Sequence, residues 1–260
     1  MRVLVTNDDG VSSPGIAALA RALVEAGHDV VVAAPLDDRS GSGAGIGPMH
    51  LNEHILVEPA EIDDLPNVPA FGVEGPPALA VMAARLGAFG EPPALVASGI
   101  NPGCNTGRSV LHSGTVGAAL TAANFGISAM AASIDVGEDY HFETAGALSA
   151  AVVRWLEGQP PRTVINLNVP NVALDEINGV RAARLAPFGT VRAAIAEHRR
   201  GRLQLEMRAT GVELAPDTDT ALVQAGFAAV TALAGIREDA ERANPADDLE
   251  AEIRANVASR

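Results

Sequence analysis

The chain of 260 residues contains no lysine, since all 18 of its basic residues are arginines. Without a lysine amine the chain cannot form a pyridoxal Schiff base, a serine–lysine dyad or a Walker-type phosphate loop. Its formal net charge of -14 also disfavours sequence-independent binding to nucleic acids or to anionic membrane surfaces. An anionic substrate would therefore need local help from a metal ion or from backbone amides.

Cysteine is almost as scarce. The single cysteine, Cys104, cannot form an internal disulfide, and Asp8 and Asp9 stand where a signal peptide would have its apolar core. We therefore expect a cytoplasmic protein. No activating partner for Cys104 is identifiable, so a neutral, packed thiol is expected.

Charged residues are absent from residues 109–134, a stretch long enough to cross a membrane. The stretch nevertheless contains Thr121, Asn124 and Gly126, and it divides into a helix, a glycine stop and a strand. We therefore predict the buried layers of an α/β fold here, in preference to a membrane span.

Strands and helices alternate over the first 170 residues. Apolar runs predict a strand at the N-terminus and others at 28–34, 94–97, 127–134 and 163–169, with helices at 14–26, 114–124 and 144–156. This alternation predicts a mostly parallel sheet with helices on both faces.

After residue 170 the pattern changes. Strands are expected at 179–185, 202–207 and 227–233 without full helices between them, followed by an exposed helix from Asp247 or a frayed end. We therefore divide the chain into a core of residues 1–170 and a hairpin and tail region of residues 171–260, both within one globular unit.

The first candidate site follows the first predicted strand, where Asn7-Asp8-Asp9-Gly10 provides two adjacent carboxylates. In open α/β sheets, ligands bind beyond the carboxyl ends of the strands. Neighbouring anions at such a place need a cation or a shared proton to offset their repulsion. A helix-capping role would account for only one of the two carboxylates, so we favour a hard divalent metal ion.

Three more polar segments are expected at the same edge of the sheet. Ser40 follows the second strand in a glycine-rich loop, and its hydroxyl oxygen is a candidate ligand for the same cation. Asn101 carries an amide oxygen suited to a hard cation, while Asn105 can donate to a phosphoryl oxygen. Ser113 and Thr115 stand at a helix start, which favours anion binding, although both are also good caps.

Taken together, these motifs resemble those of the SurE family of metal-dependent nucleotide phosphatases, in order from Met1 to Leu233. The matching motifs are Asn7-Asp8-Asp9-Gly10 with Pro14-Gly15, Ala34-Pro35 with Arg39-Ser40-Gly41, Ser98-Gly99-Ile100-Asn101 with Gly103 and Asn105, and Ser113-Gly114-Thr115-Val116. Weaker matches are Leu167-Asn168-Val169-Pro170, and Thr218-Asp219 leading to Val230-Thr231.

The resemblance implies a Rossmann-like three-layer α/β/α sandwich, with the metal-phosphatase core in residues 1–170 and a C-terminal β-hairpin region that supports homodimers or homotetramers. It implies hydrolysis of nucleoside 5'- or 3'-monophosphates, with one Mg²⁺ or Mn²⁺ ion held by Asp8, Asp9, Ser40 and Asn101. Asp8 and Asp9 are the expected catalytic residues. The expected substrate-binding residues are Asn7, Gly41, Asn105, Ser113, Gly114 and Thr115.

Several alternatives stay open. The attacking group is either a water molecule or Asp8 itself, through an aspartyl-phosphate. The chain departs from the family pattern at Gly45-Ile46-Gly47 and at residues 75–79. Alternative functions are therefore hydrolysis of another phosphorylated metabolite, or a catalytically silent oligomeric binding module. A dinucleotide-dependent oxidoreductase is disfavoured, because residues 7–10 stand where glycines would have to admit a pyrophosphate.

Overall fold

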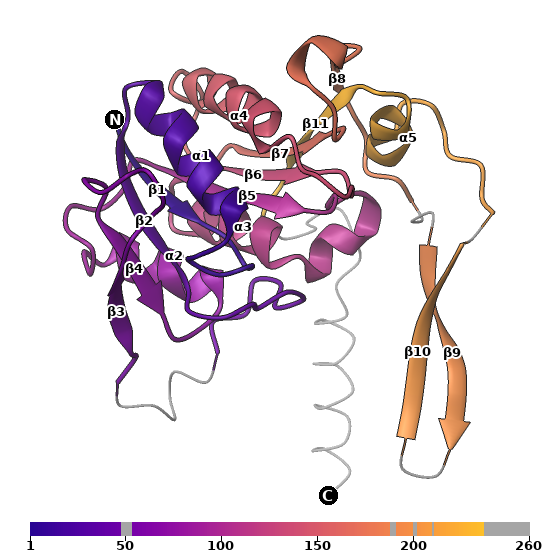
Figure 1. Cartoon of the computed structure of the whole chain (residues 1–260), viewed down its shortest axis with the longest axis horizontal. Coiled ribbons are helices and arrows are strands. Elements are labelled where there is room, and N and C mark those ends of the chain that lie inside the picture. Colours follow the sequence, from indigo (N-terminus) through magenta and orange to yellow (C-terminus); the bar gives the residue numbers. More distant parts are fainter. Residues whose placement is uncertain (48–53, 188–190, 200–201, 210, 237–260) are drawn as a thin grey trace, which may run out of the picture.

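The computed structural model describes residues 1–47, 54–187, 191–199, 202–209 and 211–236, and its main feature is a sheet of nine strands flanked by helices (Figure 1). The strands of this sheet are β1 (Arg2–Thr6), β2 (Asp29–Pro35), β3 (Val57–Ala60), β4 (Ala70–Val73), β5 (Leu95–Pro102), β6 (Ser128–Ile134), β7 (Val164–Val169), β8 (Val180–Ala182) and β11 (Ala228–Leu233). The helices are α1 (Pro14–Glu25), α2 (Pro77–Arg85), α3 (Gly114–Asn124), α4 (Phe142–Leu156) and α5 (Asp219–Gln224), with 3-10 turns η1 (Gly107–His112) and η2 (Leu174–Glu176).

The strand order places β1 where the direction of winding reverses. The order is β3-β4-β2-β1-β5-β6-β7-β11-β8, and the strands from β4 through β7 in this order run parallel. Because the chain adds β2 on one side of β1 and β5 on the other, a crevice is expected beyond the carboxyl end of β1. The predicted mostly parallel α/β sheet is confirmed.

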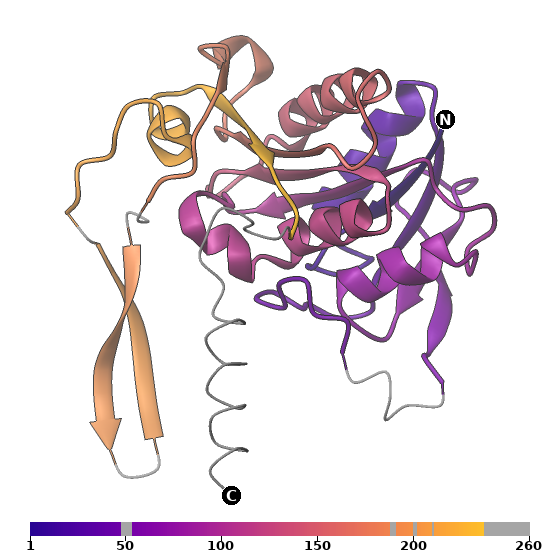
Figure 2. The same cartoon turned by 180° about the vertical axis from the view of Figure 1, so that it is seen from behind.

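Helices cover both faces of the sheet. Along β1, Val3 and Val5 belong to the core formed with α1 and α4, whereas Leu4 belongs to the core formed with α2 and α3. This alternation follows from the two-residue period of a strand. Figures 1 and 2 show the resulting three layers from opposite sides.

The uncharged stretch 109–134 does form a helix and a strand. It contains most of η1, then α3 and β6, whose residues are mainly buried between the layers. Within the described part of the chain, no helix combines the length and the apolar character needed to cross a membrane.

The region after residue 170 contributes to two sheets. β11 lies antiparallel to β7 and parallel to β8, so both strands extend the main sheet. β9 (Val191–Arg199) and β10 (Arg202–Ala209) form a separate antiparallel hairpin that projects from the layered core in Figures 1 and 2. The predicted strand 179–185 is shortened to β8, and the strand predicted at 202–207 is β10, in a β-hairpin as expected for this region. The bounds of β9 and the helix α5 were not predicted. The helix expected from Asp247 lies outside the described residues.

One predicted boundary was wrong in a way that affects the site. β5 does not end at residue 97 but continues to Pro102, so Ser98 and Asn101 lie within the strand and not in a loop beyond it. The pairing with β6 shifts register between these two residues. Gly99 lies so close to β6 that a Cβ there would overlap the carbonyl oxygen of Ala132. The end of the strand was misplaced because a glycine in a sequence is usually a signal for a loop.

Candidate functional site

Asn7 closes the turn that follows β1. Its side-chain oxygen accepts a hydrogen bond from the Gly10 N–H (3.2 Å), and its amide donates to the Gly10 carbonyl (3.1 Å) and to Ser13 Oγ (2.6 Å). Asn7 is fully buried, so these bonds tie the turn to the start of α1. Asn7, which was predicted to bind substrate, therefore stabilises the loop that carries Asp8 and Asp9.

Asp8 connects the end of β1 to the start of α3. Its Oδ2 accepts a hydrogen bond from the Gly114 N–H (3.0 Å), and its Oδ1 accepts one from the Thr115 hydroxyl. The Thr115 oxygen also lies 3.4 Å from Asn101 Oδ1. Asp8 is buried, and these bonds hold its carboxylate in one orientation. Residues from β1, β5 and α3 therefore meet at one point of the sheet edge.

Asp9 has a buried carboxylate oxygen without a partner. In the described part of the chain, no group donates a hydrogen bond to its Oδ2. Burial, followed by the charges of Asp8 and Asp38, raises the pKa of Asp9 to about 7. A cation would satisfy this oxygen and offset the repulsion between the carboxylates. The site therefore fits a hard divalent metal ion.

The loop after β2 lies against Asp8. The Arg39 N–H donates to the Asp8 carbonyl oxygen (2.7 Å), and Ser40 follows at an exposed position. Both the N–H and the hydroxyl of Ser40 donate to Asp38 Oδ1, each over 2.7 Å. The lone pairs of the Ser40 hydroxyl oxygen are still available to a cation. Gly41 is exposed beside it.

Two glycines of α3 allow the β2 loop and Asp8 to approach the helix. A Cβ on Gly114 would lie 2.7 Å from Asp8 Oδ2 and 2.6 Å from Ser42 Oγ, and a Cβ on Gly117 would overlap the Gly43 carbonyl. The Gly43 N–H also donates to the carbonyl of residue 112 over 3.1 Å. The glycine-rich loop is therefore packed against α3 and is not a free surface linker.

The start of α3 combines capping with orientation of Asp8. Ser113 Oγ accepts a hydrogen bond from the Val116 N–H (3.1 Å), which is the capping role weighed against anion binding in the sequence. The backbone N–H of Gly114, the residue after Ser113, donates its hydrogen bond to Asp8 Oδ2. Ser113 and Gly114 thus bond to protein groups, while Thr115 bridges Asp8 and Asn101.

Four polar residues near the site were not predicted from the sequence. Asp38 lies close enough to Asp9 to raise the pKa of its carboxyl group. The sequence signal that could have pointed to Asp38 is the acidic pair Asp37-Asp38 after the second strand. Ser133, Asn166 and Asn168 contact Asn105 from the neighbouring strands. Ser133 and Asn166 occupy the interior of apolar strands, where no local pattern marks them, and Asn168 belongs to the weaker family match Leu167-Asn168-Val169-Pro170, to which no role was assigned.

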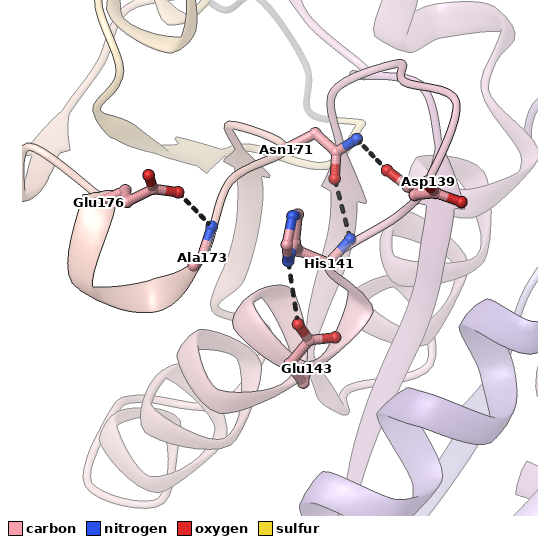
Figure 3. Close-up of polar contacts among 6 residues, drawn as sticks. All are labelled: Asp139, His141, Glu143, Asn171, Ala173 and Glu176. Carbon is pink, nitrogen blue, oxygen red and sulfur yellow. Dashed lines mark hydrogen bonds and ion pairs between the residues drawn. The ribbon is translucent and has the colours of Figure 1, made fainter.

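Asn171, just after β7, restrains the loop between β6 and α4. Its Oδ1 accepts a hydrogen bond from the His141 N–H (2.9 Å), and its Nδ2 donates to the Asp139 carbonyl (2.7 Å), as Figure 3 shows. The same loop carries Val136, whose Cγ1 lies 3.8 Å from the position of a Cβ on Gly103. This restrained loop therefore borders the segment between Asn101 and Asn105.

Cys104 packs in that segment against a small apolar cluster that includes Leu222 and Val223. Burial, followed by the charges of Asp135 and Asp219, raises the pKa of its thiol well above the usual range. Because thiols react as thiolates, we expect Cys104 to react with Ellman's reagent at about pH 8 at least about 100-fold more slowly in the folded protein than in concentrated urea. Equal rates in the two conditions would contradict this environment.

The candidate metal ligands include only two carboxylates. A group of three or more histidine, cysteine, aspartate or glutamate side chains able to hold a metal is absent from the described residues. A set of Asp8, Asp9, Asn101 and Ser40 would complete its shell with neutral oxygens and water, as a hard cation such as Mg²⁺ accepts.

Fold and site together define a doubly wound α/β protein with an oxygen-rich site beyond the end of β1, the strand at which the direction of winding reverses. The family model described as "Survival protein SurE" matches residues 3–191. The chain belongs to the SurE family.

Individual relatives agree with this assignment. The chain is 37% identical over 238 residues to the 5'/3'-nucleotidase SurE of Erwinia tasmaniensis, covering 90% of each protein. It is 38% identical over 186 residues to the 5'-nucleotidase SurE of Nostoc sp., covering 71% of this chain and 69% of the relative. A crystal structure of the SurE protein from Aquifex aeolicus matches with a TM-score of 0.77 and 29% identity, covering 93% of this chain and 96% of that one.

Proposed function

We propose that this chain is a divalent-metal-dependent phosphomonoesterase that hydrolyses nucleoside 5'- and 3'-monophosphates to nucleoside and phosphate. The observation that carries the proposal is the pair of carboxylates of Asp8 and Asp9 just beyond the end of β1. One buried oxygen of Asp9 has no hydrogen-bond partner in the described part of the chain. The names of its relatives, 5'/3'-nucleotidase and 5'-nucleotidase, support nucleotides as the substrates.

One Mg²⁺ or Mn²⁺ ion is the proposed cofactor, held by Asp8, Asp9, Asn101 and Ser40. When bound, such an ion supplies positive charge that neutralises phosphoryl oxygens. The chain's own groups prepare the site, because Thr115 and the Gly114 N–H fix the carboxylate of Asp8.

Asn105 is the proposed contact to the phosphoryl group. One hydrogen of its side-chain amide is donated to Ser133 Oγ (2.9 Å), and the second has no partner in the described part of the chain. Gly41, also proposed to bind the substrate, is exposed in the loop after β2. Both oxygens of Asp8 already accept hydrogen bonds, which favours a water molecule over Asp8 as the attacking group.

A cytoplasmic homodimer or homotetramer is the proposed assembly. An apolar groove lies between α4 and the strands β7, β11 and β8, and its lining includes Trp155 and Val180, both about half exposed. An interface between copies would remove these side chains from water. A single cysteine, incapable of an internal disulfide, agrees with a reducing compartment.

A panel of phosphate esters tests the function. Nucleoside 5'- and 3'-monophosphates, sugar phosphates and p-nitrophenyl phosphate are incubated with Mn²⁺, with Mg²⁺ and with EDTA, and inorganic phosphate is measured. We expect the largest kcat/KM for a nucleoside monophosphate, with activity lost in EDTA and restored by added metal. A higher kcat/KM for another ester would support the specialised phosphatase, and no release from any ester would support the silent binding module.

A further inference from the structure

Asn105 is held through both its backbone and its side chain. Its backbone oxygen accepts hydrogen bonds from Asn166 Nδ2 (2.8 Å) and Asn168 Nδ2 (3.1 Å), and its side-chain amide donates to Ser133 Oγ (2.9 Å). The three anchoring residues are completely buried. Both lone pairs of the Asn105 carbonyl are thereby occupied.

The anchors lie on one face of neighbouring strands. Ser133 of β6 is opposite Asn168 of β7, and Asn166 is two residues earlier on β7 and so points to the same face. Asn101 of β5 is opposite Ser133 in the same register. The row of polar side chains therefore runs from the candidate metal ligand Asn101 to the residues that hold Asn105.

Burying these two amides leaves polar atoms unsatisfied. The side-chain oxygens of Asn166 and Asn168 are buried and have no hydrogen-bond partner in the described part of the chain. The alternate residues of β7, such as Leu167, are apolar and belong to the core. Unsatisfied polar atoms in an otherwise apolar strand are costly and require an explanation. Among the described residues, the side-chain NH2 groups of Asn166 and Asn168 donate hydrogen bonds only to the backbone carbonyl of Asn105.

We propose that Asn166 and Asn168 are positioning residues that hold Asn105 in the orientation in which its side chain meets the phosphoryl group. The proposal rests on the proposed function, in which Asn105 contacts substrate. Loss of the two bonds would free the backbone at residue 105 and displace the side-chain amide. A displacement of about 1 Å at a reacting group can lower a rate by about 100-fold.

The test compares two changes on the same strand. The double variant Asn166→Ala/Asn168→Ala is expected to lower kcat by about 10-fold to 100-fold, with a change of less than about twofold in the Mn²⁺ concentration that gives half-maximal activity. Leu167→Ala is the matched control, because Leu167 lies between the two asparagines but on the opposite face and is buried. It is expected to lower the melting temperature and to leave kcat unchanged well below that temperature.

A double-mutant cycle asks whether the two asparagines act through Asn105. If they do, adding Asn166→Ala/Asn168→Ala to Asn105→Ala lowers kcat no further than Asn105→Ala alone. The single variants Asn166→Ala and Asn168→Ala, which each keep one bond to the carbonyl, serve where the double variant does not fold. Additive losses would overturn the proposal, as would a kcat equal to that of Leu167→Ala.

A readout without turnover separates this proposal from the function itself. The ¹⁵N side-chain amide resonance of Asn105, assigned by its loss in Asn105→Asp, should move in the double variant and stay in place in Leu167→Ala. If the unmodified protein releases no phosphate from any ester, the proposed function fails, and the positioning role is judged on this resonance and on its response to inorganic phosphate. A resonance that is unchanged in the double variant overturns the positioning role whatever the activity.

Discussion

Asp9→Asn is expected to lower metal-dependent phosphate release by at least about 1,000-fold, and Asp8→Asn by a similar factor. Either change removes one of the two adjacent charges that would hold the cation. Because Asp9→Asn also removes a charge that burial and its neighbours destabilise, the metal-free variant should melt no lower than the unmodified protein. Phosphate release with Mn²⁺, and melting temperature with and without Mn²⁺, are the measurements.

Asp37→Asn is the matched control, since Asp37 is an exposed acid two residues from the backbone contact at Arg39. It should keep both its activity and the rise in melting temperature that bound Mn²⁺ produces. Activity of Asp9→Asn within tenfold of the unmodified protein would refute the metal-ligand assignment. A rise in melting temperature with Mn²⁺ that persists in Asp9→Asn would refute it independently of turnover.

Asp219→Ala is expected to lower the free energy of unfolding by about 3 kcal/mol or more. The carboxylate of Asp219 is completely buried and accepts hydrogen bonds from the backbone N–H groups of Gly107 (2.7 Å), Ala186 (3.0 Å) and Thr220 (2.8 Å). It thereby joins the start of α5 to η1 and to the segment after β8. Its removal leaves three buried donors without their acceptor, and urea unfolding monitored by circular dichroism measures the loss.

Asp217→Ala provides the comparison. Asp217 makes two bonds of 2.7 and 2.8 Å to Arg184, but both side chains are largely exposed, so solvent screens the pair. Its removal should leave the urea midpoint nearly unchanged. Equal midpoints for the Asp217 and Asp219 variants would show that burial of the Asp219 carboxylate does not govern its contribution.

The elements predicted best are those with local signals at their ends. The helices expected at 14–26 and 114–124 are α1 and α3, because Ser13 and Ser113 provide side-chain caps within a few residues of each helix start. The short strands β3 and β4 were not predicted. β3 pairs with β4, and β4 pairs with β2, so no run of neighbouring residues marks either strand. Pro59 in β3 and Gly72 in β4 are also residue types that are more typical of turns.

The candidate site was predictable in outline for a topological reason. Parallel strands bring their carboxyl ends to one edge, so Asp8 and Asn101 were expected near each other before any contact was known. The partners of each side chain were not predictable. Asn7 bonds within its own turn and Ser113 caps α3, while Asn105, which remains the proposed contact to the phosphoryl group, is anchored to Ser133.

The sequence by itself determined the alternation of strands and helices, the two carboxylates at the end of β1 and the absence of any lysine chemistry. These features depend on periodicity, capping and residue type, which act over a few neighbouring residues. Only the tertiary structure decided that Asp8 bonds to Thr115, 107 residues away, and that Gly107 bonds to Asp219, 112 residues away. Such contacts depend on how the layers pack, because a hydrogen bond forms only where packing brings donor and acceptor within reach.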